Sequence, residues 1–117
     1  MNTRTAAALF FALSASACGS LAGGDYACDL RPVDHQCTDW RALIGTTASQ
    51  EAVCKTLNSA QGGGSWKPNQ RCPAAGSVGG CQTNTGLGLQ TNWFYPPSTE
   101  TEVRAECMSD GTTFVTP

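Results

Sequence analysis

Seven cysteines, six of them spread between residues 28 and 107, constrain the fold of this 117-residue chain more than any other feature. An even set of cysteines in a small exported protein is typical of a disulfide framework, because a short chain buries little apolar surface. We therefore predict three disulfides among Cys28, Cys37, Cys54, Cys72, Cys81 and Cys107. The seventh cysteine, Cys18, makes the total odd and requires a separate explanation.

Cys18 follows a segment that is typical of an export signal. A short basic start precedes an apolar run over residues 6–15, which is shorter than the ~20 residues of a membrane-spanning helix. Residues 13–18 resemble the lipobox of bacterial lipoproteins, in which small residues precede a cysteine that receives diacylglycerol, although Ala15 stands where leucine is usual. Residues 15–17 also fit the ordinary signal peptidase. Lipidation is favoured because ordinary cleavage would leave a free thiol outside the cell.

These features predict how the chain is divided. Residues 1–17 form a cleaved signal peptide, and Cys18 carries acyl chains such as palmitate. Residues 18–27 form the lipidated N-terminus and tether, in which residues 19–24 are small and flexible, and residues 28–117 suffice for one domain.

The same features predict a protein of the bacterial cell envelope, held to a membrane through its N-terminal lipid. Gly19, rather than aspartate, after the lipid site resembles the outer-membrane sorting pattern of diderm lipoproteins. Plain secretion is the alternative. Without Arg4 the chain has six basic and nine acidic side chains and no basic cluster, which argues against nucleic acid as a partner.

The chain from residue 28 on is expected to contain an internal repeat, with copies over residues 28–71 and 72–117. In each copy eight residues separate the first two cysteines, Cys28 from Cys37 and Cys72 from Cys81. Aromatic residues, a segment with one cysteine and a glycine–aromatic ending then follow in the same order. We predict a small disulfide-rich α+β domain of two tandem strand–helix–strand repeats with pseudo-twofold symmetry.

Capping signals place one helix in each copy. Thr47 with Gln50, and Thr99 with Glu102, have the spacing of a capping box, in which side chains and backbone amides pair at the start of a helix. Each helix is expected to stop at a glycine, because glycine readily adopts the left-handed conformation that ends helices.

The strand signals are uneven. Glycine–aromatic segments at residues 62–66 and 111–114 predict strands, and residues 79–83 and 87–95 predict a hairpin. Residues 29–36 lack a clear strand pattern, so the first copy is less regular than the second.

The cysteines can pair in many ways, and the sequence leaves the choice open. Three cysteines in each copy require at least one bridge between copies. The glycines and proline between Cys72 and Cys81 suit a loop that brings these two side by side. The preferred pairing is therefore Cys28–Cys37, Cys72–Cys81 and Cys54–Cys107.

Chemistry-bearing motifs are sparse, so we expect a protein that is not an enzyme and holds no cofactor or metal. His35 is the single histidine, and no G-x-S-x-G turn precedes a helix. The cysteine spacing does not fit zinc, and no calcium or phosphate-binding loop is present. Glu100 and Glu102 lie where acidic residues stabilise a helix start.

The aromatic residues are the remaining candidates for binding. Trp40, Trp93 and Tyr95 could form a surface for an envelope protein or a glycan, with the Tyr95 hydroxyl left exposed. The favoured interpretation is that they build the core together with the few apolar residues of the helices, Val53, Leu57 and Val103. We expect a non-enzymatic binding or structural module; a small hydrolase or hydrolase inhibitor is the alternative.

A resemblance supports the location. Cys72-Pro73, the Gly79-Gly80-Cys81 triplet, an aromatic strand, a helix with Cys107 and the ending at residues 111–114 resemble a module in short uncharacterised cysteine-rich bacterial lipoproteins. The resemblance implies a cell-envelope location and a disulfide-stapled fold. It implies no activity and no site residues.

Overall fold

The computed structural model describes residues 23–45 and 47–117, so the expected signal peptide and Cys18 lie outside the described residues. The described elements are β1 (Gly24–Asp29), β2 (Gln36–Leu43), α2 (Ala48–Thr56), the 3₁₀ turn η1 (Ser59–Gln61), β3 (Ser65–Pro68), β4 (Gly79–Asn84), β5 (Leu89–Phe94), α3 (Glu100–Asp110) and β6 (Thr113–Val115). β1 begins at Gly24, so part of the segment assigned to the tether belongs to the sheet.

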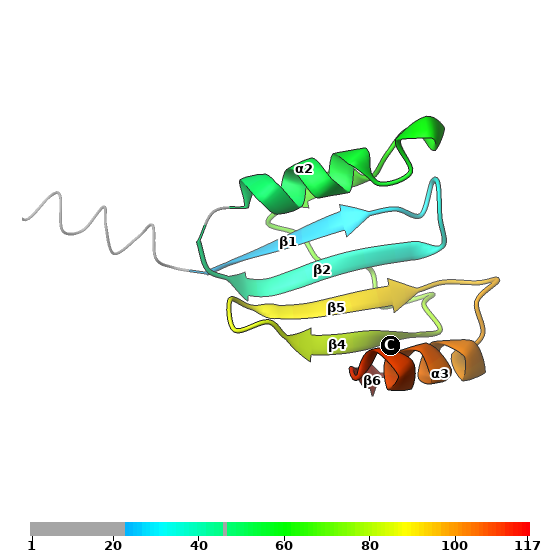
Figure 1. Ribbon diagram of the computed structural model, residues 1–117. Coiled ribbons are helices and arrows are strands. Elements are labelled where there is room, and N and C mark those ends of the chain that lie inside the picture. Colours follow the sequence, from blue (N-terminus) through cyan, green and yellow to red (C-terminus); the bar gives the residue numbers. More distant parts are fainter. Residues whose placement is uncertain (1–22, 46) are drawn as a thin grey trace, which may run out of the picture.

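The strands form one antiparallel sheet in the order β3-β1-β2-β5-β4-β6 (Figure 1). Each half of the chain contributes two strands, a helix and a third strand, and the two halves meet where β2 pairs with β5. This confirms the small, disulfide-rich α+β domain. The strands predicted at 62–66, 111–114 and in the hairpin are present as β3, β6, β4 and β5.

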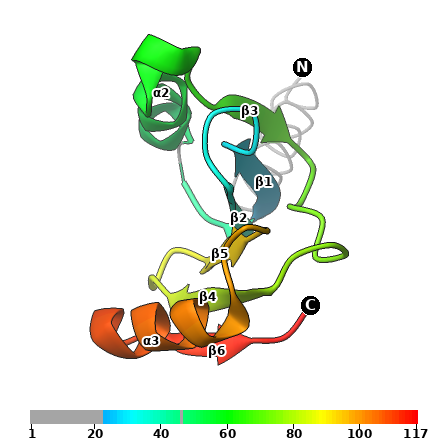
Figure 2. The same ribbon diagram turned by 90° about the vertical axis from the view of Figure 1, so that its right-hand side faces the viewer.

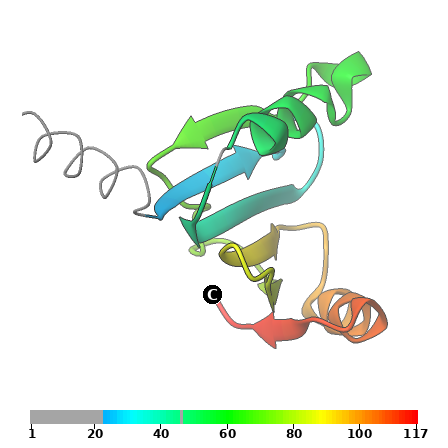
Figure 3. The same ribbon diagram turned by 60° about the vertical axis from the view of Figure 1, so that its left-hand side comes forward.

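One row of residues crosses all six strands and shows on which side the helices lie. Its members are directly opposite one another in register, in the order Trp66, Cys28, Thr38, Asn92, Cys81 and Phe114. Opposite residues in antiparallel strands share a face. Two members form bridges to helices, Cys28 to Cys54 in α2 and Cys81 to Cys107 in α3. Both helices therefore lie on this face, the helix face (Figures 2 and 3).

The connection over residues 69–78 covers the opposite face, which we call the loop face (Figure 2). The third bridge, Cys37–Cys72, fastens this connection to β2. Side chains buried there form one core cluster: Ala27, Cys37, Cys72, Trp93 and Tyr95.

The preferred disulfide pairing is therefore wrong. The bridges are Cys28–Cys54, Cys37–Cys72 and Cys81–Cys107. Register explains the error: Cys28 lies opposite Thr38 while Cys37 lies opposite Asp29, so the side chains of Cys28 and Cys37 point to opposite faces. The repeat also matched Cys28 with Cys72, yet Cys28 lies in β1 and Cys72 precedes β4. Cys37–Cys72 is the bridge between the expected copies.

The two helices begin differently. α3 has the predicted capping box, because Thr99 Oγ1 accepts the Glu102 amide and the Glu102 carboxylate accepts the Thr99 amide. The box predicted for α2 is wrong. Thr47 has helical rather than extended backbone angles (φ −96°, ψ −1°) and makes no side-chain cap bond, while Gln50 instead accepts the Ser49 hydroxyl.

Residues 30–35, which lacked a strand pattern, form the turn between β1 and β2. At the other end of this pair the backbone is irregular. Ala42 has a φ of +52°, and the Asp25 carboxylate accepts the Ala42 amide at 3.1 Å and the Arg71 guanidinium at 2.8 Å. A positive φ is unfavourable for alanine and needs support from neighbouring groups. The hydrogen bond from the Ala42 amide to Asp25 provides such support and helps to fix the end of β2.

Candidate functional site

A groove of about 350 Å³ lies on the helix face between α2 and the central strands. Its volume falls at the lower end of the range for small-ligand sites. We call it the α2 groove and define it by its lining: Cys28, Thr38, Trp40, Ser49, Gln50, Val53, Cys54, Leu57 and Gln90. None of these nine side chains carries a charge, since both cysteines are in a disulfide. The lining therefore offers a ligand no charged side chain.

Trp40 forms the aromatic part of the groove and is held from two sides. Its indole N–H donates to Gln90 Oε1 at 3.0 Å, across the β2–β5 pair. Behind it the Trp66 ring lies 5.8 Å away between centroids, and Tyr26 stacks on Trp66 at 5.6 Å. Ring contacts at these distances are favourable and limit rotation of the indole. Trp40 therefore presents a fixed, half-buried ring to the groove.

Polar groups also line the groove. Thr38 donates its hydroxyl to Asn92 Oδ1 at 2.8 Å, and Ser49 donates to Gln50 Oε1 at 2.9 Å. The amide groups of Gln50 and Gln90 each retain N–H donors, because these bonds use their oxygens. The groove thus offers amide and hydroxyl groups beside an aromatic surface.

The apolar wall comes from α2. Val53 and Leu57 were expected in the core but are 57% and 43% exposed, and both line the groove. The bridge to Cys28 turns Cys54 toward the sheet, and Cys54 is the one buried residue of α2. Its neighbour Val53 is left exposed at the edge of the groove. In α3, Val103 is buried as expected.

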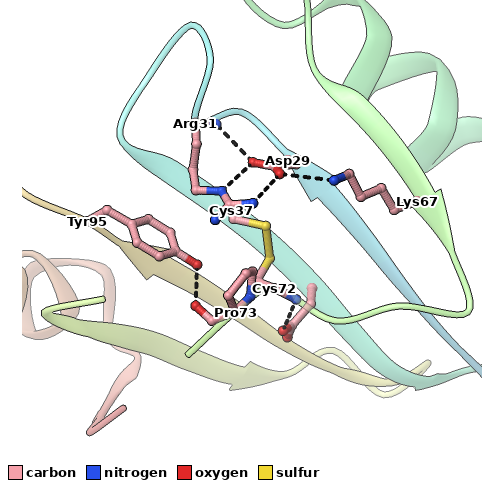
Figure 4. Close-up of polar contacts among 8 residues, drawn as sticks. Asp29, Arg31, Cys37, Lys67, Cys72, Pro73 and Tyr95 are labelled. Carbon is pink, nitrogen blue, oxygen red and sulfur yellow. Dashed lines mark hydrogen bonds and ion pairs between the residues drawn. A yellow bond between two sulfur atoms is a disulfide. The ribbon is translucent and has the colours of Figure 1, made fainter. Parts of the chain in front are cut away.

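Trp93 and Tyr95 do not join Trp40 on one surface. Trp93 lies opposite Cys37, on the loop face, whereas Trp40 is on the helix face. Both residues are buried in the core. The expected exposed hydroxyl of Tyr95 instead donates to the Pro73 carbonyl at 2.5 Å (Figure 4), and burial raises the pKa of this hydroxyl. The structure thus places Trp93 and Tyr95 in the core, as the favoured interpretation expected, and of these three residues only Trp40 lines the groove.

Two carboxylates on the loop face have opposite environments. Asp29 accepts the side chain of Arg31 at 2.6 and 2.8 Å and lies 3.4 Å from Lys67 (Figure 4). The hydrogen bonds from Arg31 lower the pKa of Asp29 to about 2. Asp39 is buried, and burial raises the pKa of its carboxyl despite bonds from the Cys72 amide and the Trp93 indole. Its second oxygen, Oδ1, is buried with no hydrogen-bond partner.

The other chemistry-bearing residues stand apart. His35 is exposed in the β1–β2 turn, where its amide donates to Asp34. In the part of the chain that the structure describes, no three His, Cys, Asp or Glu residues are grouped as metal ligands would be. Nor does any helix described there have the length and apolar character needed to span a membrane.

Sequence reasoning missed most of the groove. The polar lining residues Thr38, Gln50 and Gln90 come from three separate elements. A partial signal existed, because Thr38 and Trp40 are two residues apart and therefore share one face of β2. No known family model, curated protein or solved structure matches this chain.

Proposed function

We propose that this protein is a non-enzymatic, lipid-anchored binding module of the cell envelope that takes a neutral saccharide in the α2 groove. The observation that carries the binding proposal is the uncharged groove, in which the Trp40 ring lies among amide and hydroxyl groups. Sugar rings have apolar C–H faces that stack on aromatic rings and hydroxyl rims that pair with amides. An anionic ligand would find no cation in this lining.

Three disulfides support an exported protein, because such bonds persist outside the reducing cytoplasm. They use six of the seven cysteines, which leaves Cys18 as the residue to carry acyl chains. Mass spectrometry of the protein purified from its membrane tests the anchor. The expected N-terminus is an acylated Cys18, and Cys18→Ser should release the folded protein from the membrane. An unmodified N-terminus would refute the lipid anchor.

The fold supports the groove in a second way. We infer that a pseudo-twofold symmetry relates the two halves of the chain, because positions in one half can be matched with positions in the other. Both strand–helix bridges join residues 26 apart in sequence. Counted from Thr38 and Asn92, which pair at the centre of the sheet, Trp40 matches Phe94. Counted from the helix cysteines, Gln50 matches Val103. A pseudo-twofold axis through the Thr38–Asn92 pair relates these positions.

The matching positions differ in what they bury. Phe94 and Val103 pack together in a core cluster that closes the space between α3 and the sheet. Trp40 and Gln50 instead line the open groove beside α2. The same architecture can therefore close this space with apolar side chains, and the first half of the chain leaves it open. That difference favours a binding role for the α2 groove over a role in packing.

The binding test is a titration of the purified protein against a panel of neutral oligosaccharides, with charged ones for comparison. We expect a neutral saccharide to bind and Trp40→Ala to weaken its affinity by roughly 30-fold, the effect of losing an aromatic anchor. Met108→Ala is the matched control, because Met108 is 82% exposed on α3 and is not part of the groove lining. Equal affinity of Trp40→Ala and the native protein would refute the site.

A further inference from the structure

We propose that one end of the sheet, formed by Gly23, Ile44 and Leu87, rests on the phospholipid surface to which Cys18 is anchored. We call it the tether end. The inference rests on the proposed lipid anchor and adds to it an orientation: the tether end touches the headgroup region, and the β1–β2 turn points away from the membrane.

Backbone contacts bring the three segments of the tether end together. Gly24 lies opposite Leu43 in the β1–β2 register, and the Ile44 amide donates to the Leu87 carbonyl at 2.7 Å. Figure 1 shows the start of β1, the end of β2 and the β4–β5 turn at the same end of the sheet. The point where the chain enters the fold is thus beside Ile44 and Leu87.

Gly23 is held closely at this point. A Cβ atom at Gly23 would lie 2.5 Å from the Ala42 carbonyl oxygen, closer than side chains are found. Ala42 is itself fixed by the Asp25 carboxylate, which also pairs with Arg71. Ala42 precedes Ile44 by two residues. The N-terminal segment therefore joins the sheet at a defined position close to Ile44.

The length of chain between anchor and fold is short. Cys18 precedes Gly23 by five residues, which span at most about 18 Å even when fully extended. The eight residues of β2 alone extend over roughly 26 Å. The tether end consequently stays within reach of the bilayer, and its surface chemistry decides whether it makes contact.

Two large aliphatic side chains are exposed at the tether end. Ile44 is 48% exposed and Leu87 is 55% exposed, and the residues beside them, Gly45 and Gly86, are small and uncharged. Aliphatic side chains of this kind gain stability by entering the boundary between headgroups and acyl chains. Arg71, half-exposed at the same end, is paired with Asp25 at 2.8 Å, so this pair adds no net charge to the tether end.

The far end carries charged side chains of both signs, with Arg31 in the β1–β2 turn and Arg104 paired with Glu100 at 2.8 Å. It contains the β1–β2 turn with Asp34 and the start of α3 with Glu100 and Glu102, and a bond from the Tyr95 amide to the His35 carbonyl joins these parts. Charged groups of this kind stay hydrated and gain nothing from the apolar boundary of a bilayer. Apolar contact at one end and hydrated charges at the other therefore favour the same orientation.

The experiment uses the isotope-labelled lipoprotein purified from membranes and placed in bilayers of phosphatidylethanolamine and phosphatidylglycerol that contain a lipid with a spin-labelled headgroup. The spin label broadens amide signals that lie near the headgroups. We expect the signals of Ile44, Gly86 and Leu87 to lose most of their intensity and those of Asp34 and Glu100 to keep it.

The double variant Ile44→Ser/Leu87→Ser should lose this pattern while it remains anchored and folded, because both side chains are largely exposed. Met108→Ser is the control, since it removes an exposed apolar side chain from α3, and it should keep the pattern. Strongest broadening at the far end or around Val53 would overturn the orientation, as would an unchanged pattern in the double variant. The orientation would also be overturned if Ile44 and Leu87 were buried between two copies of the protein in the absence of lipid.

A second arm separates the orientation from the anchor itself. If the purified protein carries no lipid, the thiol of Cys18, the one cysteine outside the three disulfides, is coupled to a maleimide phospholipid before the measurement. The same broadening pattern would then support the orientation although the natural anchor had failed. An even distribution of broadening in this arm refutes it.

Discussion

Removal of the Cys37–Cys72 bridge should destabilise the protein more than removal of either strand–helix bridge. This bridge closes a loop of 35 residues, and the other two close loops of 26. Loop-closure entropy in the unfolded chain then gives about 3.8 kcal/mol for Cys37–Cys72 and about 3.5 kcal/mol for each of the others. The double variant Cys37→Ala/Cys72→Ala is the perturbation.

A hydrogen bond adds to the difference. The Cys72 amide donates to Asp39 Oδ2 at 3.0 Å, and Asp39 is buried with its other oxygen unpaired. Release of the connection over residues 69–78 loosens this bond, which contributes about 1 kcal/mol more. We expect a total loss of about 4–5 kcal/mol, measured by urea unfolding with tryptophan fluorescence. Cys28→Ala/Cys54→Ala is the matched control, with an expected loss of about 3.5 kcal/mol.

A tryptic digest without reductant checks the pairing on which this reasoning depends. Trypsin cleaves after Arg41, Lys55, Arg71 and Arg104, whereas Arg31 and Lys67 precede prolines and resist cleavage. The observed bridges hold all four cysteine-containing peptides together in one species. The pairing preferred from sequence would instead leave the peptides that end at Arg41 and Arg104 unlinked to any other. Recovery of those separate peptides, or a loss below about 1 kcal/mol in the double variant, would refute the account.

Two further predictions concern the caps and the acid response. Thr99→Ala should lower the free energy of unfolding by about 1 kcal/mol, and Thr47→Ala should leave it nearly unchanged, because only Thr99 makes a side-chain cap bond; equal losses in urea unfolding would contradict this. The stabilisation from Asp29 is complete above its ordinary pKa of 3.8 and is lost as the pH falls toward its folded value of about 2. Asp39 acts in the opposite sense, because its raised pKa makes stability fall as the pH rises above 3.8. The free energy of unfolding, plotted against pH, should therefore become less pH-dependent below pH 3.8 in Asp29→Asn and above pH 3.8 in Asp39→Asn. The reverse result would refute the assignments.

The second half of the chain was the more predictable from sequence. Its hairpin, the capping box of α3 and the buried Val103 follow from local signals, and all three are present. In the first half the capping signal at Thr47 failed, because spacing alone does not fix the backbone angles of the N-cap residue.

The disulfides and the groove depend on which face of the sheet each residue occupies. Equal spacing of Cys28–Cys37 and Cys72–Cys81 suggested bridges within each pair, but a strand register that places Cys28 opposite Thr38 turns Cys37 away. The alternation of side chains along the strands likewise places Trp40 and Trp93 on opposite faces of the sheet. Register and the position of α2 are set by long-range pairing, which a local pattern does not specify.

The most direct test of the proposed function is the response of the indole N–H signals to a neutral oligosaccharide in a proton–nitrogen correlation spectrum. Trp40 and Trp93 give a comparison within one molecule, because the Trp40 indole lies in the groove and the Trp93 indole is buried against Asp39 on the other face. Binding in the α2 groove predicts that the Trp40 signal shifts on titration while the Trp93 signal stays in place. A bound saccharide that leaves the Trp40 signal unmoved would contradict the assignment of the groove as the binding site.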